Sequence, residues 1–198
     1  MTTEHARWLL GGGLASGKSQ VRRHLEEAGI DTIDADSVGH LVLEPNGPAF
    51  DAVSRRWPQV VFDGRIDRPA LASVVFADRE QLSLLESITH PHIFREISRR
   101  VATLNGPVVV EMPLIANPFG SGWRRIVVDC IDEIRFRRAV ERGMDEAEVR
   151  RRMDVQPKRA EWLAVADVVV PNNGDLAEAA TTSMILGQII MEDSRAGR

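Results

Sequence analysis

The chain has 198 residues, 43% of them hydrophobic and 27% charged, which is the balance of an ordinary globular protein. At about 150 residues per domain, this length predicts one domain with insertions. The net charge of −4 disfavours a strongly basic nucleic-acid-binding protein. A single cysteine, Cys130, excludes an internal disulfide. Without a long apolar stretch, or a signal peptide in residues 1–7, we expect a soluble cytoplasmic protein that binds neither membrane nor nucleic acid.

Apolar runs alternate with helical patterns along the chain, as in the β-α-β units of a parallel sheet. Strands are predicted, in order, at residues 8–10, 30–35, 107–115, 126–130 and 167–170. Helices are predicted at residues 18–28, 133–142, 145–153 and 177–191. The third strand is apolar on both faces, which favours a central position. About 70 mostly helical residues separate the second and third strands, which suggests an inserted segment that faces the substrate.

A glycine-rich loop lies between the first strand and the first helix. Its sequence, Gly12-Gly-Leu-Ala-Ser-Gly-Lys-Ser19, fits the pattern G-x-x-x-x-G-K-[ST] of a phosphate-binding loop. Lys18 would reach the β- and γ-phosphates of a nucleotide, and the Ser19 hydroxyl would bind Mg²⁺. A chance match is the alternative, while a dinucleotide fingerprint fails because Ser16 stands at its last glycine position. The expected nucleotide-binding residues are Gly13, Leu14, Ala15, Ser16, Gly17, Lys18, Ser19 and Gln20.

Acidic residues at two predicted strands are candidates for chemistry. Asp34 and Asp36 close the second strand, and residues two apart on a strand point to the same side. Both would face a ligand beyond the strand ends, where one could accept a proton from an acceptor hydroxyl. Equally, Asp36 could cap a helix. Glu111 lies in an apolar strand, where a carboxylate needs a partner; that partner is either a hydrated Mg²⁺ or an arginine.

Arginines recur after the fourth strand. Arg135, Arg138 and Arg142 are spaced so that they share one helical face. They predict a mobile lid that neutralises transferring phosphates. The alternative is a solvated face whose arginines pair with neighbouring glutamates.

Six segments, taken in order, resemble those of dephospho-CoA kinases. They are residues 12–19, 28–36, 63–78, 85–91 (LESITHP), 111–115 (EMPLI) and 156–174. On these segments the chain is identified as a member of that family over residues 7–190. The resemblance implies an α/β fold: a three-layer α/β/α P-loop NTPase with a five-stranded parallel sheet. It also implies a core at residues 7–36, 104–132 and 164–191, an acceptor-binding insertion at residues 37–103 and a lid at residues 133–163.

The resemblance also implies an activity and a set of site residues. The reaction would transfer the γ-phosphate of ATP, with Mg²⁺, to the ribose 3′-hydroxyl of dephospho-CoA, in a monomer or small homo-oligomer. The implied catalytic residues are Asp36 as general base, Lys18, Arg138 and Arg142. Asn172 would lie near the adenine, Ser19 would bind the metal directly and Glu111 would bind it through water. The implied substrate-binding residues are Asp36, His40, Asp67, Arg68, His90 and Pro113.

Six positions depart from the family pattern. Gly11 replaces threonine, Ala15 glycine, Gln20 serine or threonine, His40 arginine, Asn117 glutamate and Arg135 glutamine. Ala15 cannot adopt a positive φ cheaply, and His40 replaces a permanent cation with a group that is mostly neutral at pH 7. Two alternatives therefore stay open: a divergent kinase for another hydroxyl acceptor, and a non-catalytic nucleotide- or CoA-binding protein.

Overall fold

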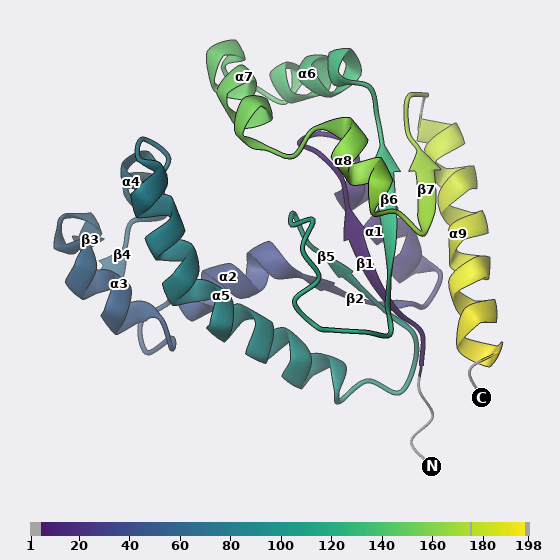
Figure 1. Ribbon diagram of the computed structural model, residues 1–198, viewed down its shortest axis with the longest axis horizontal. Helices are drawn as coiled ribbons and strands as arrows, with labels where there is room; N and C mark the ends of the chain where they lie inside the picture. The colour runs from purple at the N-terminus through teal and green to yellow at the C-terminus, as the bar shows by residue number, and fades with distance from the viewer. Residues whose placement is uncertain (1–4, 175, 197–198) are drawn as a thin grey trace. The chain divides into compact units, whose positions relative to one another are not determined.

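A five-stranded parallel sheet carries the fold (Figure 1), and its strand order is β2-β5-β1-β6-β7. The computed structural model describes residues 5–174 and 176–196, so residues 1–4 of the N-terminal segment considered above lie outside it. The strands are β1 (Arg7–Gly11), β2 (Asp31–Asp34), β5 (Val108–Glu111), β6 (Trp123–Asp129) and β7 (Val168–Pro171). β1 pairs with β5 and β6 on its two sides, so β1 takes the centre of the sheet.

The third predicted strand is interior but shorter than expected. β5 covers Val108–Glu111 and lies between β2 and β1, whereas the sequence predicted a central strand over residues 107–115. The pairing ends when the Met112 N–H donates to the Leu10 carbonyl at 3.0 Å. The next residue, Pro113, has no N–H with which to continue it.

Two helices cover one face of the sheet. Trp8 and Leu10 of β1 pack with Leu25 of α1 (Lys18–Glu27) and with Leu186 of α9 (Leu176–Ala196). Because successive strand residues point to opposite faces, Leu9 and Gly11 face the other side. There α8 (Arg159–Ala164) packs against β6 and β1, with Trp162 directly on Gly11.

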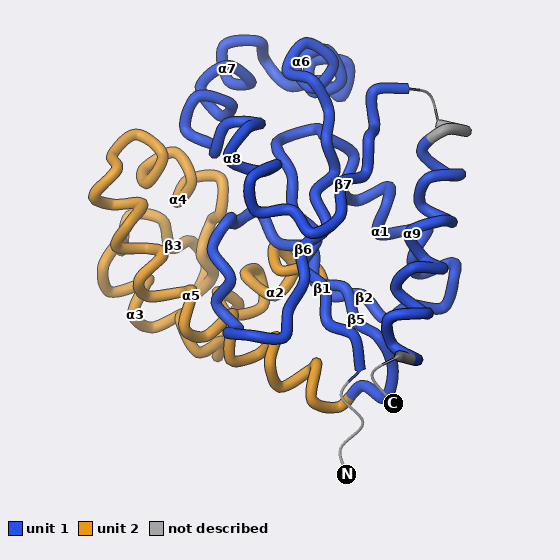
Figure 2. The backbone as a smooth tube through the Cα atoms, turned by 45° about the vertical axis from the view of Figure 1, so that its right-hand side comes forward, with its two compact units in different colours: residues 1–33, 104–198 blue, residues 34–103 orange. Residues whose placement is uncertain are grey.

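The chain divides into two compact units, residues 1–33 with 104–198 and residues 34–103 (Figure 2). The second unit has its own apolar core, which includes Val53, Trp57 and Leu71. Its helices are α2 (Ala35–Val42), α3 (Phe50–Arg56), α4 (Arg68–Val75) and α5 (Arg79–Val101), with a 3-10 turn at Pro58–Val60. An antiparallel hairpin that the sequence did not predict, β3 (Val61–Phe62) and β4 (Arg65–Ile66), completes it.

The predicted lid segment belongs to the first unit. It forms α6 (Asp132–Glu141), α7 (Glu146–Val155) and the short α8. The sequence predicted α6 and α7 to within two residues at each end and missed α8. Among residues 5–174 and 176–196, no helix is long and apolar enough to cross a bilayer.

Candidate active site

The glycine-rich loop joins β1 to α1 and is held in shape by backbone conformations that favour glycine. Gly12 has φ +141° and Gly17, the N-cap of α1, has φ +103°. The Ser16 N–H donates to the Gly13 carbonyl at 3.2 Å, which closes a tight turn. The loop therefore delivers backbone N–H groups to the N-terminus of α1, where the helix dipole favours an anion.

Asn172, expected near the adenine, directly follows β7 and fastens the same loop. Its side-chain amide donates to the Ser16 carbonyl at 2.7 Å, and its own N–H donates to the Asp129 carbonyl at 2.7 Å. A Cβ on Gly17 would collide with the Asn172 amide. Glycine is therefore required at Gly17 for two reasons, its left-handed φ and this close approach.

Lys18 and Ser19, the two side chains expected at the phosphates and the metal, have partners inside the loop and on β5. The Lys18 ammonium donates to the carbonyls of Gly12 and Gly13 at 2.9 and 3.1 Å. The Ser19 hydroxyl donates to Glu111 Oε1 at 3.1 Å. The structure thus brings together Ser19 and Glu111, the two side chains expected at the metal.

Glu111 has the arginine partner that was one of the two interpretations left open by the sequence. Its Oε1 accepts from Ser19, and its Oε2 accepts from Arg22 Nε at 2.8 Å. The Glu111 side chain is 11% exposed, so the arginine supplies the counter-charge that a buried carboxylate needs. One oxygen is thereby fixed by an ion pair while the other stays directed at the loop.

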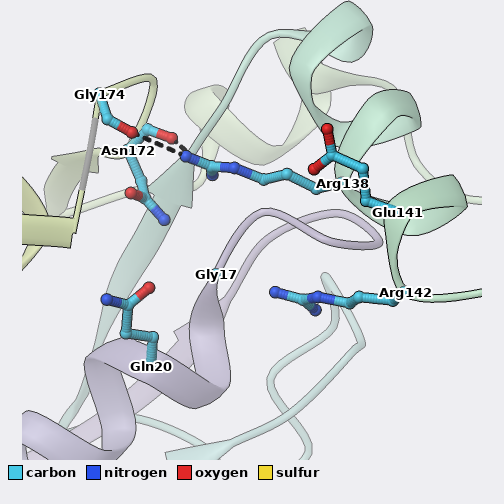
Figure 3. Close-up of a pocket in the computed structure, with 7 residues that line it drawn as sticks. All are labelled: Gly17, Gln20, Arg138, Glu141, Arg142, Asn172 and Gly174. Atoms are coloured by element: carbon cyan, nitrogen blue, oxygen red, sulfur yellow. Dashed lines mark hydrogen bonds between the residues drawn. The ribbon is translucent and has the colours of Figure 1, made fainter.

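A cavity of about 350 Å³ opens beside the N-terminus of α1 (Figure 3). Five of the predicted site residues line it: Gly17, Gln20, Arg138, Arg142 and Asn172. The sequence analysis did not assign Glu141 and Gly174 to the site, although both line the same cavity. Glu141 directly precedes Arg142, and Gly174 belongs to the family-like segment that contains Asn172, so their neighbours were the available signal.

The two arginines of the cavity differ in their contacts. The Arg138 guanidinium donates to the carbonyls of Asn172 and Gly174, both at 2.9 Å (Figure 3). It therefore holds the loop after β7 in place. Arg142, at the C-terminus of α6, is exposed and lines the cavity opposite Gln20.

Arg135 is the third arginine of the predicted face, and it is buried at 4% exposure. Its Nε donates to the Leu14 carbonyl at 2.9 Å, and its Nη1 pairs with Asp132 at 2.7 Å. Gln156 accepts the Leu14 N–H at 2.8 Å. The predicted lid segment thus contacts the glycine-rich loop directly.

The Asp34–Asp36 pair corrects the sequence-based prediction. β2 ends at Asp34, and Asp36 lies in the first turn of α2, so the two carboxylates do not share a strand face. The cap is Asp34, whose Oδ1 accepts the N–H of Asp36 at 2.9 Å. The prediction of a strand pair was wrong, and the capping alternative named the wrong aspartate. Asp36 is exposed on α2.

The other predicted acceptor-binding residues have local roles in their own elements. In the second unit, His40 is exposed on α2, Asp67 caps α4 by accepting the Ala70 N–H at 3.0 Å, and Arg68 begins that helix. His90 packs on Phe94 within α5, with ring centroids 5.2 Å apart. In the first unit, Pro113 follows β5 and is exposed.

The loop, Lys18 and the adjoining cavity define a P-loop nucleotide-binding protein of the α/β class. A family model described as dephospho-CoA kinase matches residues 9–178. The chain belongs to the dephospho-CoA kinase family.

Curated relatives agree with this assignment, and two solved structures share the fold. A dephospho-CoA kinase of Methylococcus capsulatus is 39% identical over 177 residues, which cover 85% of this chain and 88% of the relative. One of Corynebacterium glutamicum is 42% identical over 181 residues, covering 85% and 91%. A crystal structure from Thermus thermophilus superposes with a TM-score of 0.79 at 29% identity, covering 93% and 97%. A dephospho-CoA kinase from Campylobacter jejuni shares the fold, with a TM-score of 0.70 at 24% identity, covering 94% and 97%.

Proposed function

We propose that this chain transfers the γ-phosphate of ATP to the ribose 3′-hydroxyl of dephospho-CoA, giving coenzyme A and ADP. Membership of the dephospho-CoA kinase family makes the chain a phosphotransferase that uses ATP. One observation carries the proposal: the family match extends from residue 9 to residue 178, a range that includes the glycine-rich loop, Glu111 and the arginines of α6.

The proposed ATP binding rests on groups in and beside the glycine-rich loop. The backbone N–H groups and the α1 dipole attract the phosphates. Lys18 would exchange the carbonyls of Gly12 and Gly13 for β- and γ-phosphate oxygens. The cavity beside Asn172 would take the nucleoside. In this assignment Arg142 lies at the mouth of the site, while Arg138 acts through the loop after β7 that it holds.

The residues present fit the Mg²⁺ that this family implies. Mg²⁺ prefers oxygen ligands and retains several waters, and the Ser19 hydroxyl and Glu111 Oε1 are oxygen donors 3.1 Å apart. Ser19 would bind the ion directly and Glu111 would hold one of its waters. The bound ion would neutralise charge on the β- and γ-phosphates. Arg22 contributes by fixing the second oxygen of Glu111 at 2.8 Å.

The acceptor side rests on the second unit. Asp36 is the proposed general base because a carboxylate can accept the proton of the 3′-hydroxyl, and the Asp34 cap fixes the helical turn that carries it. His40, Asp67, Arg68 and His90, with Pro113 of the first unit, are the proposed acceptor contacts. We place the reaction in the cytoplasm and assign a monomer or small homo-oligomer without a nucleic-acid partner, in keeping with one free cysteine and a net charge of −4.

The test is ADP release from Mg-ATP with and without dephospho-CoA, with the product identified as coenzyme A by mass. Asp36→Asn should lose most turnover while the Kd for ATP stays unchanged, because the change removes the base and leaves the glycine-rich loop intact. Asp34→Asn is the matched control, since asparagine caps a helix as well as aspartate does. Normal turnover of the Asp36 variant would overturn the base assignment. If both substrates bind but no coenzyme A is formed, the proposed reaction is overturned.

A further inference from the structure

The tip of the glycine-rich loop contains a strained residue. Ala15 has φ +54°, one of three positive φ angles at non-glycine residues in the described part of the chain. A side chain in this left-handed region is unfavourable relative to glycine. Something outside the residue itself must therefore hold the loop in this conformation.

Two side chains from the predicted lid segment, Arg135 and Gln156, bind the backbone of Leu14, the residue before Ala15; we call this pair the bracket. Gln156 accepts the Leu14 N–H at 2.8 Å, and Arg135 Nε donates to the Leu14 carbonyl at 2.9 Å. Arg135 Nη2 lies 3.4 Å from the same Gln156 oxygen, so the two side chains also contact each other. The guanidinium packs so closely on Gly13 that a Cβ there would collide with it.

The bond to the Leu14 carbonyl acts directly on Ala15. That carbonyl belongs to the Leu14–Ala15 peptide, which is planar and trans. The orientation of this plane is one of the two that define φ of Ala15. It also sets the direction of the Ala15 N–H, which points opposite to the carbonyl. By fixing the carbonyl, Arg135 fixes both the strained angle and a backbone donor of the loop.

The remaining contacts of Arg135 argue against a direct role at the phosphates. Its Nη1 is held by Asp132 at 2.7 Å, its Nη2 faces Gln156 and its Nε is bonded to Leu14. The side chain is 4% exposed. Each nitrogen of the guanidinium thus has a partner within the protein, and the group acts on the loop backbone.

We propose that Arg135 is a positioning residue for ATP: it holds the Leu14–Ala15 peptide, while Gln156 holds the preceding Gly13–Leu14 peptide, and together they keep Ala15 in its left-handed conformation. This inference rests on the proposed function for its reaction, but it concerns ATP binding and can be tested without turnover. Its consequence is energetic coupling between Arg135 and Ala15, which the Leu14–Ala15 peptide links.

The experiment is a double-mutant cycle on the Kd for Mg-ATP, measured by calorimetry on the full chain without dephospho-CoA. R135Q, which introduces the family's usual residue, should weaken ATP binding about tenfold, equivalent to about 1.4 kcal/mol. A15G, in which glycine adopts the same φ without strain, provides the second background of the cycle, and its own Kd is the reference for that arm. In the A15G background, R135Q should weaken ATP binding only about twofold, equivalent to about 0.4 kcal/mol.

Two further variants separate positioning from charge and from general stability. R135K keeps the charge but lacks the planar fork, so it should weaken ATP binding as R135Q does. R137Q is the matched control, because Arg137 lies on the same helix and its side chain is 66% exposed; it should bind ATP normally. In the kinase assay, R135Q should raise KM for ATP and leave KM for dephospho-CoA unchanged. If R135Q fails to fold, Q156A with A15G completes the same cycle.

An equal loss of ATP affinity from R135Q in the Ala15 and A15G backgrounds would overturn the inference, as would normal affinity of R135Q or R135K. The outcomes for the two proposals are distinct. Coupling in the ATP cycle without coenzyme A formation refutes the proposed reaction and supports the bracket. If coenzyme A is formed but the effects of R135Q and A15G on the Kd for Mg-ATP are additive, the proposed reaction is supported and the role of Arg135 is refuted.

Discussion

Gly11 offers the sharpest test of how the first strand meets α8. A Cβ built on Gly11 would lie 2.5 Å from Cζ3 of Trp162, with Cε3 and Cη2 at 3.1 and 3.3 Å. The family usually has threonine at this position. Gly11→Thr therefore introduces the common residue into a place that the indole ring already fills.

The geometry sets the size of the effect. Carbon atoms attract each other best at about 3.5–4.0 Å, so the ring would have to move about 1 Å to accommodate the Cβ alone. Trp162 is 3% exposed, so it has little room to retreat. Overpacking of this kind costs about 1–3 kcal/mol. At about 2–4 °C per kcal/mol for a chain of this size, a cost of about 2 kcal/mol lowers Tm by about 4–8 °C.

Thermal unfolding followed by circular dichroism measures this shift. Gly106→Thr is the matched control, because nothing lies within 4 Å of a Cβ on Gly106; its Tm should stay within about 2 °C of the wild type, as for surface substitutions generally. Trp162→Leu should cost less stability in the G11T background than alone, since it removes the clash. A G11T variant with the Tm of G106T, or strict additivity with W162L, would refute the argument.

Two further predictions concern charged groups. Glu111→Gln removes the charge opposite Ser19. It should raise the Mg²⁺ concentration for half-maximal activity about tenfold, as loss of an outer-shell metal partner does; an unchanged Mg²⁺ titration would contradict the metal assignment. Hydrogen bonds from Arg99 and Arg100 lower the pKa of Glu96 from 4.5 to about 2. The contribution of these two ion pairs to the free energy of unfolding is therefore fully present above pH 4.5 and disappears as the pH falls towards 2. Because the group is near solvent, Glu96→Gln should cost only about 0.5 kcal/mol in urea unfolding at pH 7. The same deficit at pH 2 would contradict this.

The strand, glycine-rich loop and helix could be predicted because each is specified locally. The apolar residues of β1 and the glycines and lysine that follow lie within 12 consecutive residues, 7–18. Alternation with helical segments then predicts a parallel sheet. The order of strands needs contacts between distant segments, so the sequence favoured β5 for the centre that β1 occupies.

The error at Asp34 and Asp36 has a physical cause. Both residues are good helix caps, and an aspartate at a strand end looks the same in sequence as one that opens a helix. The backbone turns at Asp34, with φ −94° and ψ 112°, and its carboxylate captures the Asp36 N–H. A strand that ends one residue earlier than predicted thus changes which carboxylate is structural.

The arginines of α6 show what periodicity leaves undetermined. Their spacing correctly predicts a common helix, yet Arg135 contacts Leu14, 121 residues away, while Arg138 contacts Asn172 and Gly174. A helical repeat gives the face on which a side chain lies and says nothing of the segment that packs on that face. The Gln156 bond to Leu14 spans 142 residues and was missed for the same reason.

Three departures from the family pattern meet at the glycine-rich loop, and the structure gives each a partner. Gly11 leaves the space that Trp162 fills, Ala15 adopts a left-handed φ, and Arg135 holds the peptide that precedes it. Trp162 and Arg135 both come from the predicted lid segment. Because Arg135 and Ala15 are linked through one peptide, R135Q alone should weaken ATP binding far more than R135Q together with A15G. The departures at the loop therefore argue for an altered way of holding the same phosphate-binding backbone, and they do not argue for its loss.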